Sequence, residues 1–129
     1  MIVTLFVSSC RTLYSYLKIA RYYISELEQC LIVPKCEEKE KPVFHRFIVQ
    51  HEERDRLKQF LQDKGVMTAV NYPLPLHLHE ASEAYGYKKG DFAIAEDQAS
   101  KILSLPIYPE LKDIQIEYVV ECIKEFCAL

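Results

Sequence analysis

Residues 66–79 read Val-Met-Thr-Ala-Val-Asn-Tyr-Pro-Leu-Pro-Leu-His-Leu-His, and the other elements are expected to arrange themselves around this stretch. Its first part is short, apolar and β-prone, which predicts a strand at 66–71. Pro73 and Pro75 hold φ at roughly −65° and have no N–H to donate, so the strand cannot continue as a central ladder partner past Tyr72. We therefore expect a rigid, extended loop at the end of a strand.

This loop gathers Asn71, Tyr72, His77 and His79, the densest set of site-capable side chains in the chain. Rigid loops that present polar groups are a common setting for ligand contacts. An ordinary proline-rich surface connection has the same spacing, and spacing alone favours that simpler interpretation.

The loop lacks a complete catalytic or metal-binding motif. His77 and His79 with Glu80 and Glu83 suggest a metal site, but two histidines at this spacing project together only on a strand, so we predict no metal. The chain has only 3 glycines, which excludes a dinucleotide fingerprint and a phosphate loop.

Composition indicates one globular domain. The chain has 129 residues, of which 50% are hydrophobic and 27% charged, and its net charge is −3 with the two signs interleaved. We find no basic stripe for nucleic acid and no apolar run of the ~20 residues that a membrane span needs.

The cysteines are odd in number and form no Cys-x-x-Cys pair, so reduced thiols and a cytoplasmic location are expected. They are Cys10, Cys30, Cys36, Cys122 and Cys127.

Apolar periodicity predicts an α+β domain. Helices are expected at 11–30, 53–64, 91–101 and 112–127, with a short helical turn at 80–85. The second helix should turn Leu57, Phe60 and Leu61 inward, and Phe92, Ala95, Ala99 and Ile102 are spaced as one face of the third. Extended segments are expected at 31–33, 43–50, 66–71 and 102–105. Such few and short strands imply a small, mainly antiparallel sheet of three to four strands with about four to five helices packed on it.

Four details of these elements can be checked directly. The first helix should bury a stripe that begins at Leu13 and runs to Leu27, and Asp91 should cap the third helix. The last helix should include Cys127 in its apolar stripe. In the strand at 43–50, a histidine such as His45 among apolar neighbours is more often a core or edge group than a catalyst.

Six motifs occur in a specific order and spacing. They are Lys18-Ile19-Ala20-Arg21-Tyr22-Tyr23, Val43-Phe44-His45-Arg46-Phe47-Ile48-Val49, Arg54-Asp55-Arg56-Leu57 followed by Lys64-Gly65-Val66, Asn71-Tyr72-Pro73-Leu74-Pro75-Leu76-His77, Gly86-Tyr87 with Gly90-Asp91-Phe92 and Ala95-Glu96, and Leu103-Ser104-Leu105-Pro106-Ile107-Tyr108-Pro109. Over residues 18–128 the chain thereby resembles the C-terminal small domain of the DegT/DnrJ/EryC1/StrS family of pyridoxal-phosphate sugar aminotransferases.

The resemblance implies a fold-type I enzyme that moves an amino group from glutamate or glutamine onto a keto-sugar nucleotide, as in cell-surface polysaccharide biosynthesis. In such enzymes a large-domain lysine holds pyridoxal phosphate. No lysine here has that family context, so we expect no cofactor bound by this chain alone and no catalytic residue in it. Carried over by motif, Tyr72, His77 and Asn71 would face the sugar or its phosphates, and His45 would back them from a neighbouring strand.

None of these motifs lies in residues 1–17, so we expect an unmatched segment at 1–17 followed by an aminotransferase-like domain at 18–129. We hypothesise a truncated or remnant polypeptide without transaminase activity of its own. The alternative is a binding or assembly module that docks on a large-domain partner or binds a sugar nucleotide. Because a detached domain exposes apolar surface, a homo-oligomer through the tyrosine-rich N-terminal helix is expected.

Overall fold

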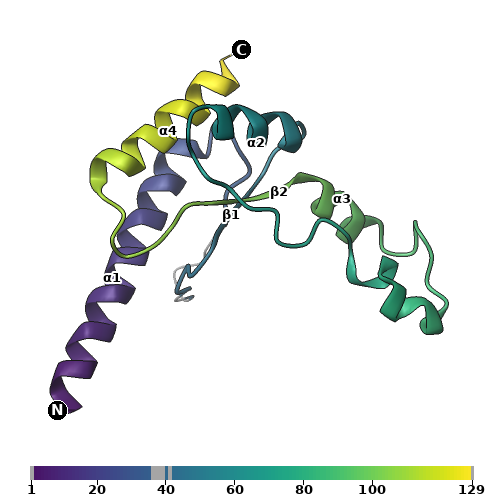
Figure 1. The fold of residues 1–129 in the computed structure, drawn as a ribbon, viewed down its shortest axis with the longest axis horizontal. Coiled ribbons are helices and arrows are strands. Elements are labelled where there is room, and N and C mark those ends of the chain that lie inside the picture. The colour runs from purple at the N-terminus through teal and green to yellow at the C-terminus, as the bar shows by residue number, and fades with distance from the viewer. Residues whose placement is uncertain (1, 36–39, 41, 129) are drawn as a thin grey trace.

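The computed structural model describes residues 2–35, 40 and 42–128, and the described part is an α+β domain. Its α-helices are α1 (Ile2–Leu27), α2 (Arg54–Asp63), α3 (Ala93–Lys101) and α4 (Asp113–Cys127). Two short 3₁₀-helices, η1 (Leu76–Leu78) and η2 (Glu80–Tyr85), precede α3, and the strands are β1 (Phe47–Gln50) and β2 (Ile102–Leu105). Figure 1 shows their arrangement.

The sheet is antiparallel as predicted, but in the described residues it has two strands rather than three to four. Phe47 pairs with Leu105 and Gln50 with Ile102 at the two ends of the ladder. The other two predicted strands each contribute a single bridge, Ile32 to Gln50 and Ala69 to Ser104. These segments lie on opposite outer edges of the ladder, so both take part in the sheet, but each forms a single bridge rather than a strand.

Local backbone chemistry explains the shortened strands. Phe44 has a φ of 48°, in the left-handed region that bulky residues rarely adopt, so the predicted strand at 43–50 starts only at Phe47. Pro34 and Pro73 lack the N–H group that a ladder requires, and they follow the bridges at Ile32 and Ala69 closely.

The body of the domain, which we define as α1, α2, α4 and the β1–β2 ladder, is held by one cluster of buried apolar side chains. The predicted inward residues Leu57 and Leu61 of α2 are fully buried, and Gly65 closes that helix with a φ of 77°. In α4 the predicted stripe is buried except at its end, where Cys127 is exposed and Cys122 takes the inward position.

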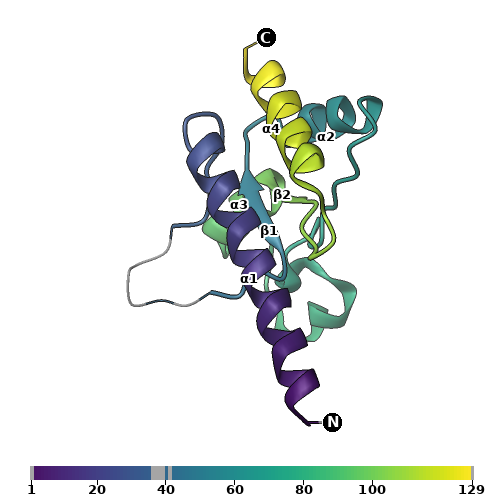
Figure 2. The ribbon, with the colours of Figure 1, turned by 90° about the vertical axis from the view of Figure 1, so that its left-hand side faces the viewer.

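Helix α1 differs from its predicted form in both bounds and buried face. It runs without interruption from Ile2 to Leu27 and projects beyond the body, as Figures 1 and 2 show. Its buried face is Ile19, Ala20, Tyr23 and Leu27, whereas Leu13 is exposed because it lies on the projecting part. No helix in the described part of the chain is long and apolar enough to cross a bilayer.

Residues 72–101, which we call the arm, leave the body on the side opposite the α1 projection (Figure 1). All residues from 67 to 98 are described, and none of them is buried. The predicted helical turn at 80–85 is confirmed, and Gly86 closes it with a φ of 74°. Helix α3 begins at Ala93 after Phe92 rather than after Asp91, whose carboxylate instead accepts a hydrogen bond from the Lys88 N–H at 2.8 Å.

Candidate functional site

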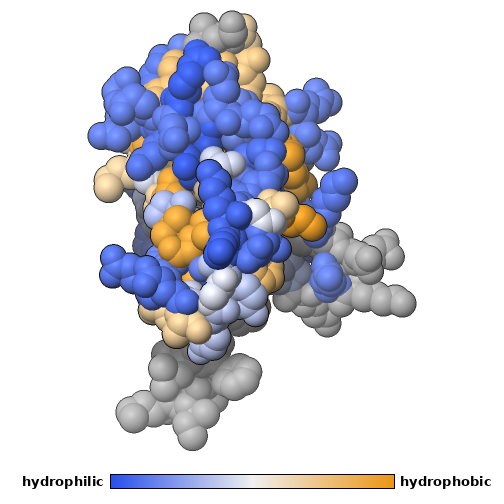
Figure 3. Space-filling view, turned by 90° about the vertical axis from the view of Figure 1, so that its right-hand side faces the viewer, coloured by the Kyte–Doolittle hydropathy of each residue, from blue (hydrophilic) through white to orange (hydrophobic). Residues whose placement is uncertain are grey.

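A groove of about 470 Å³ runs along the arm between the two-proline loop and α3. The loop contributes one wall, and the other wall is the face of α3 that the sequence predicted as apolar. The lining residues are Tyr72, Leu74, Pro75, Leu76, His77, Phe92, Ala95, Gln98, Ala99 and Ile102. Figure 3, which looks at the molecule from the arm side, shows hydrophobic side chains exposed among a largely hydrophilic surface.

The backbone of the loop positions its side chains in the groove wall. Pro75 is extended, with φ −58° and ψ 145°, and η1 starts directly after it. The Ser82 hydroxyl donates to the Leu76 carbonyl at 2.7 Å, and His79 Nε2 lies 3.2 Å from the Leu74 carbonyl oxygen. These contacts tie the loop internally, in addition to the restriction of φ that its two prolines impose.

His77 is the most enclosed polar side chain of the loop, with 8% of its side chain exposed. Its Nε2 lies 3.0 Å from Glu96 Oε1, and its ring packs against Phe92 with centroids 4.8 Å apart. The same Glu96 oxygen accepts the Gly90 N–H at 2.7 Å. The Gly90 N–H, and then His77, lower the pKa of Glu96, so the carboxylate is charged at neutral pH and accepts from His77.

The other candidate side chains have different surroundings. Tyr72 is 56% exposed and lines the groove, so its phenol is available to a ligand. Asn71 Nδ2 donates to the Ser104 hydroxyl at 2.6 Å, which fastens the start of the loop to β2. His45 is exposed in the bend before β1. Because β1 and Ala69 pair with opposite edges of β2, the structure brings Asn71, Tyr72 and His77 into one loop but separates His45 from them.

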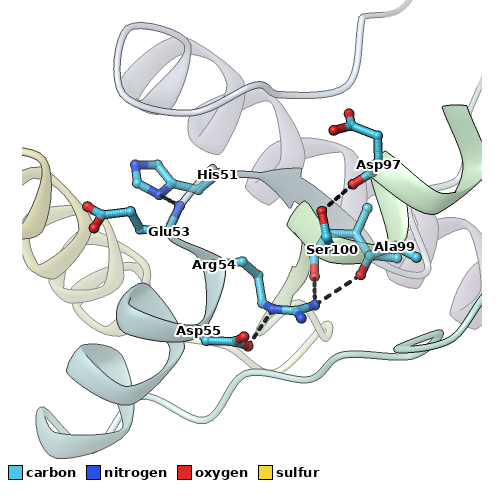
Figure 4. Close-up of polar contacts among 8 residues, drawn as sticks. His51, Glu53, Arg54, Asp55, Asp97, Ala99 and Ser100 are labelled. Atoms are coloured by element: carbon cyan, nitrogen blue, oxygen red, sulfur yellow. Dashed lines mark hydrogen bonds and ion pairs between the residues drawn. The ribbon is translucent and has the colours of Figure 1, made fainter. Parts of the chain in front are cut away.

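The attachment of the arm to the body depends on Arg54, whose role the sequence did not reveal. One guanidinium nitrogen donates to the carbonyls of Ala99 at 3.2 Å and Ile102 at 3.3 Å, at the C-terminal end of α3. Its Nε donates to Asp55 at 2.6 Å (Figure 4). A cation at a helix C-terminus satisfies carbonyls that have no intrahelical partner. The Arg-Asp motif was the available signal, but nothing in its spacing indicated which carbonyls it would meet.

A second set of contacts strengthens this junction. Lys101 Nζ lies 2.7 Å from Asp97 and 2.9 Å from Glu52, and these carboxylates raise the pKa of Lys101 in that order. The His51 N–H donates to the Lys101 carbonyl at 3.1 Å. In Figure 4 the His51 ring also accepts the Glu53 N–H.

Comparison with known proteins identifies the family. The model of the DegT/DnrJ/EryC1/StrS aminotransferase family matches residues 11–124. The chain belongs to this family. It is 42% identical over 113 residues to the pleiotropic regulatory protein of Geobacillus stearothermophilus, covering 84% of this chain and 30% of that protein. It is 34% identical over 108 residues to the erythromycin biosynthesis sensory transduction protein EryC1 of Saccharopolyspora erythraea, again covering 30% of the relative.

Solved structures agree with this assignment. The chain resembles DesV of S. venezuelae in complex with a ketimine intermediate, with a TM-score of 0.87 and 31% identity over 92% of this chain and 32% of that one. It also resembles a family aminotransferase from Brucella abortus, with a TM-score of 0.85 and 29% identity. The aminotransferase-like chain thus spans about 30% of the length of its curated relatives.

The lining of the groove does not fit a pyridoxal-phosphate anchor. A lysine that forms a Schiff base must lose its proton, which desolvation or a nearby cation promotes. No lysine lines the groove in the described part of the chain. Carboxylate partners instead raise the pKa values of Lys18, Lys64, Lys101 and Lys124.

Proposed function

We propose that this chain is the C-terminal small domain of a nucleotide-sugar aminotransferase, and that the groove of the arm forms part of the wall around the sugar nucleotide. The observation that carries the proposal is the groove itself, in which the two-proline loop and the apolar face of α3 meet. Named relatives support the substrate class. One is the dTDP-3-amino-3,6-dideoxy-alpha-D-galactopyranose transaminase of Aneurinibacillus thermoaerophilus, 29% identical over 110 residues.

Three residues carry the proposed contacts. Tyr72 presents a free phenol that can hydrogen-bond a sugar hydroxyl or a phosphate oxygen. His77, held by Glu96, keeps the loop against α3 and gives the wall its shape. Asn71 fixes the start of the loop to β2. We leave His45 out of this set because β2 separates it from the loop.

We also propose that the chain has no transaminase activity by itself. Pyridoxal phosphate supplies the electron sink of transamination when bound, and carboxylate partners favour the protonated form of Lys18, Lys64, Lys101 and Lys124. The contribution of this chain is then to bind and orient the substrate and to exclude water on one side.

Titration of the purified chain with dTDP-glucose, followed residue by residue by NMR, tests the binding proposal. We expect saturable shifts confined to amides of the loop and α3, reduced in Tyr72→Phe and lost in Tyr72→Ala. Met67→Ala is the matched control, since Met67 is 87% exposed and lies outside the groove. Shifts confined to the body, or no shifts at saturating ligand, would contradict the proposal.

Labelling tests the second claim independently. Pyridoxal phosphate is added, reduced in place and mapped by peptide mass spectrometry. We expect sparse labelling spread over several surface lysines. Stoichiometric labelling of one lysine, together with turnover of an amino donor, would contradict the absence of autonomous activity.

A second candidate is an assembly module that docks on a large-domain partner or on another copy through α1. It is favoured by exposed apolar side chains such as Tyr14 on the projecting part of α1 and Ile94 on the arm, the latter 78% exposed. If α1 mediates self-association, light scattering should give an oligomer that Tyr14→Lys dissociates and Ile94→Lys does not. A monomeric mass at micromolar concentration would contradict the homo-oligomer.

A further inference from the structure

Two cysteines that are far apart in the sequence meet where the ends of α1 and α4 pack together. Cys30 lies in the turn after α1, and Cys127 is the last residue of α4. The Cys127 thiol donates to the Cys30 carbonyl with an Sγ···O distance of 3.8 Å, across 97 positions of sequence. Burial, and then the neighbouring Cys30 thiol, raise the pKa of Cys127 to about 11. The Cys127 thiol therefore lies against the backbone of Cys30, and the Cys30 side chain is close enough to perturb it.

We propose that Cys30 and Cys127 are a redox pair that forms a reversible disulfide joining the two helix ends. Their approach is fixed by contacts that do not involve sulfur, because Lys124 Nζ and Glu26 Oε2 form an ion pair of 2.5 Å between the same two helices. Both cysteines lie in a turn or at a helix end rather than inside a helix. Small backbone adjustments, which the strict geometry of a disulfide demands, are least costly at such positions.

Neither cysteine lies in the buried core. Cys127 is exposed, and Cys30 lines a surface pocket of about 360 Å³ together with polar residues that include His51 and Lys101. Cys122, also on α4, is buried in the core and has no such access. Accessible and buried thiols of one helix therefore provide an internal comparison.

The reaction needs an external disulfide such as oxidised glutathione. The Cys30 thiolate attacks one sulfur of that disulfide and expels a first thiolate, which forms a mixed disulfide on Cys30. The Cys127 thiolate then attacks the Cys30 sulfur and expels the second thiolate. The two protons released by the cysteines end on the two expelled thiolates, so the protein is oxidised and glutathione is reduced.

The pKa of Cys127 sets the order and the pH dependence of these steps. With a pKa of about 11, Cys127 is almost entirely protonated at neutral pH. The attack of its thiolate on the mixed disulfide is therefore the slower of the two steps. Ring closure should therefore accelerate as the pH rises toward 11. Once formed, the cross-link closes a loop that contains α2, α4, both strands and the arm but not α1, which restricts the unfolded chain strongly.

Oxidation of the full chain tests the proposal. The protein is treated with oxidised glutathione at mildly alkaline pH, and its mass and cross-linked peptides are determined without reduction. We expect a loss of two hydrogen atoms, a peptide that joins Cys30 to Cys127, and a melting temperature higher by roughly 5–15 °C that dithiothreitol reverses. A background with Cys10→Ser and Cys36→Ser removes competing thiols.

Matched variants give the pair its controls. Cys30→Ser and Cys127→Ser should each abolish the rise in melting temperature, whereas Cys122→Ala should retain it even if its own starting stability is lower. A stable glutathione adduct on either cysteine without ring closure, or a cross-link that involves another cysteine while Cys30 and Cys127 stay reduced, would overturn the proposal. The peptide map of the unsubstituted chain decides this even where a variant fails to fold.

Discussion

In the body a single cluster of buried apolar side chains joins three helices to both strands, whereas in the arm no residue from 72 to 98 is buried. Hydrophobic burial supplies most of the stability of a domain, so the body can fold on its own contacts. The arm instead depends on polar contacts at its junction and inside its loop, such as Arg54 with Ala99 and His77 with Glu96. The groove lies on the arm, the less stabilised of the two regions.

This contrast suggests how such a site works. Ligand-binding segments are usually drawn from the less stable parts of a domain, which open locally without unfolding the rest. If the arm behaves in this way, substitutions in the body should change global unfolding, and substitutions in the arm should change only local opening. Single substitutions in the two regions, and a change of pH, test that separation.

Phe47→Ala should have the largest effect because it removes a fully buried ring from the body. Phe47 is the first residue of β1, and its ring packs on the Tyr23 ring with the centroids 5.2 Å apart. We expect a loss of about 3–5 kcal/mol in the free energy of unfolding, measured by urea denaturation. Met67→Ala, at an exposed position, should change it by less than about 0.5 kcal/mol. Equal effects of the two would contradict the description of the core.

Arg54→Ala should release the arm from the body. The substitution leaves the carbonyls of Ala99 and Ile102 without their charged donor, which typically costs roughly 1.5–3 kcal/mol. Hydrogen exchange should speed up in 93–102 while α4 keeps its protection. Arg54→Lys should rescue only part of this, since an ammonium group can donate to the carbonyls but has no second nitrogen for the contact that Nε makes with Asp55.

Arg56→Ala is the control for charge removal next to this position. Arg56 is more exposed than Arg54, and its guanidinium contacts Glu53 and the Phe126 ring rather than the arm. We expect no change in exchange of 93–102. Loss of protection in both variants would mean that net charge, not the capping contact, holds the arm.

Two glycines offer a matched pair between the regions. Gly65 in the body has a φ of 77° and Gly86 in the arm a φ of 74°, and in neither case does an added Cβ meet a neighbouring atom within 4 Å. Alanine should cost about 1–2 kcal/mol of backbone strain at either site. Gly65→Ala should lower the global free energy of unfolding by this amount, whereas Gly86→Ala should affect only exchange near η2. A global loss from Gly86→Ala would show that arm and body unfold together.

Low pH should weaken the contacts that Glu96 makes within the arm, and this is the smallest of the expected effects. The pKa of Glu96 lies below its ordinary value of 4.5, first because of the Gly90 N–H and then because of His77. A lowered folded-state pKa stabilises the arm above 4.5, and this contribution is lost as the pH falls through the lowered value. The NMR shift of the Gly90 amide should titrate below 4.5 in the unsubstituted chain and not in Glu96→Gln. A midpoint above 4.5 would contradict this contact.

The sequence predicted the parts of the candidate site, a stiff loop and a helix face, better than it predicted how those parts are arranged. The two prolines indicated a stiff loop, and the spacing of Phe92, Ala95, Ala99 and Ile102 indicated one helix face, because both depend on properties of neighbouring residues. That the loop and this face would form opposite walls of one groove depends on long-range packing. The separation of His45 from the loop has the same origin, since β2 inserts between them.

Local sequence was enough to predict the α+β class, the family and the approximate position of every described α-helix, though not the bounds of α1 or the start of α3, because periodicity and motif order are local properties of the chain. Only the tertiary structure decided how long each strand is, which cysteine of α4 turns inward, and which backbone groups Arg54 holds. Those outcomes depend on where segments distant in sequence come to lie, since a hydrogen bond or a buried contact needs both of its partners in place.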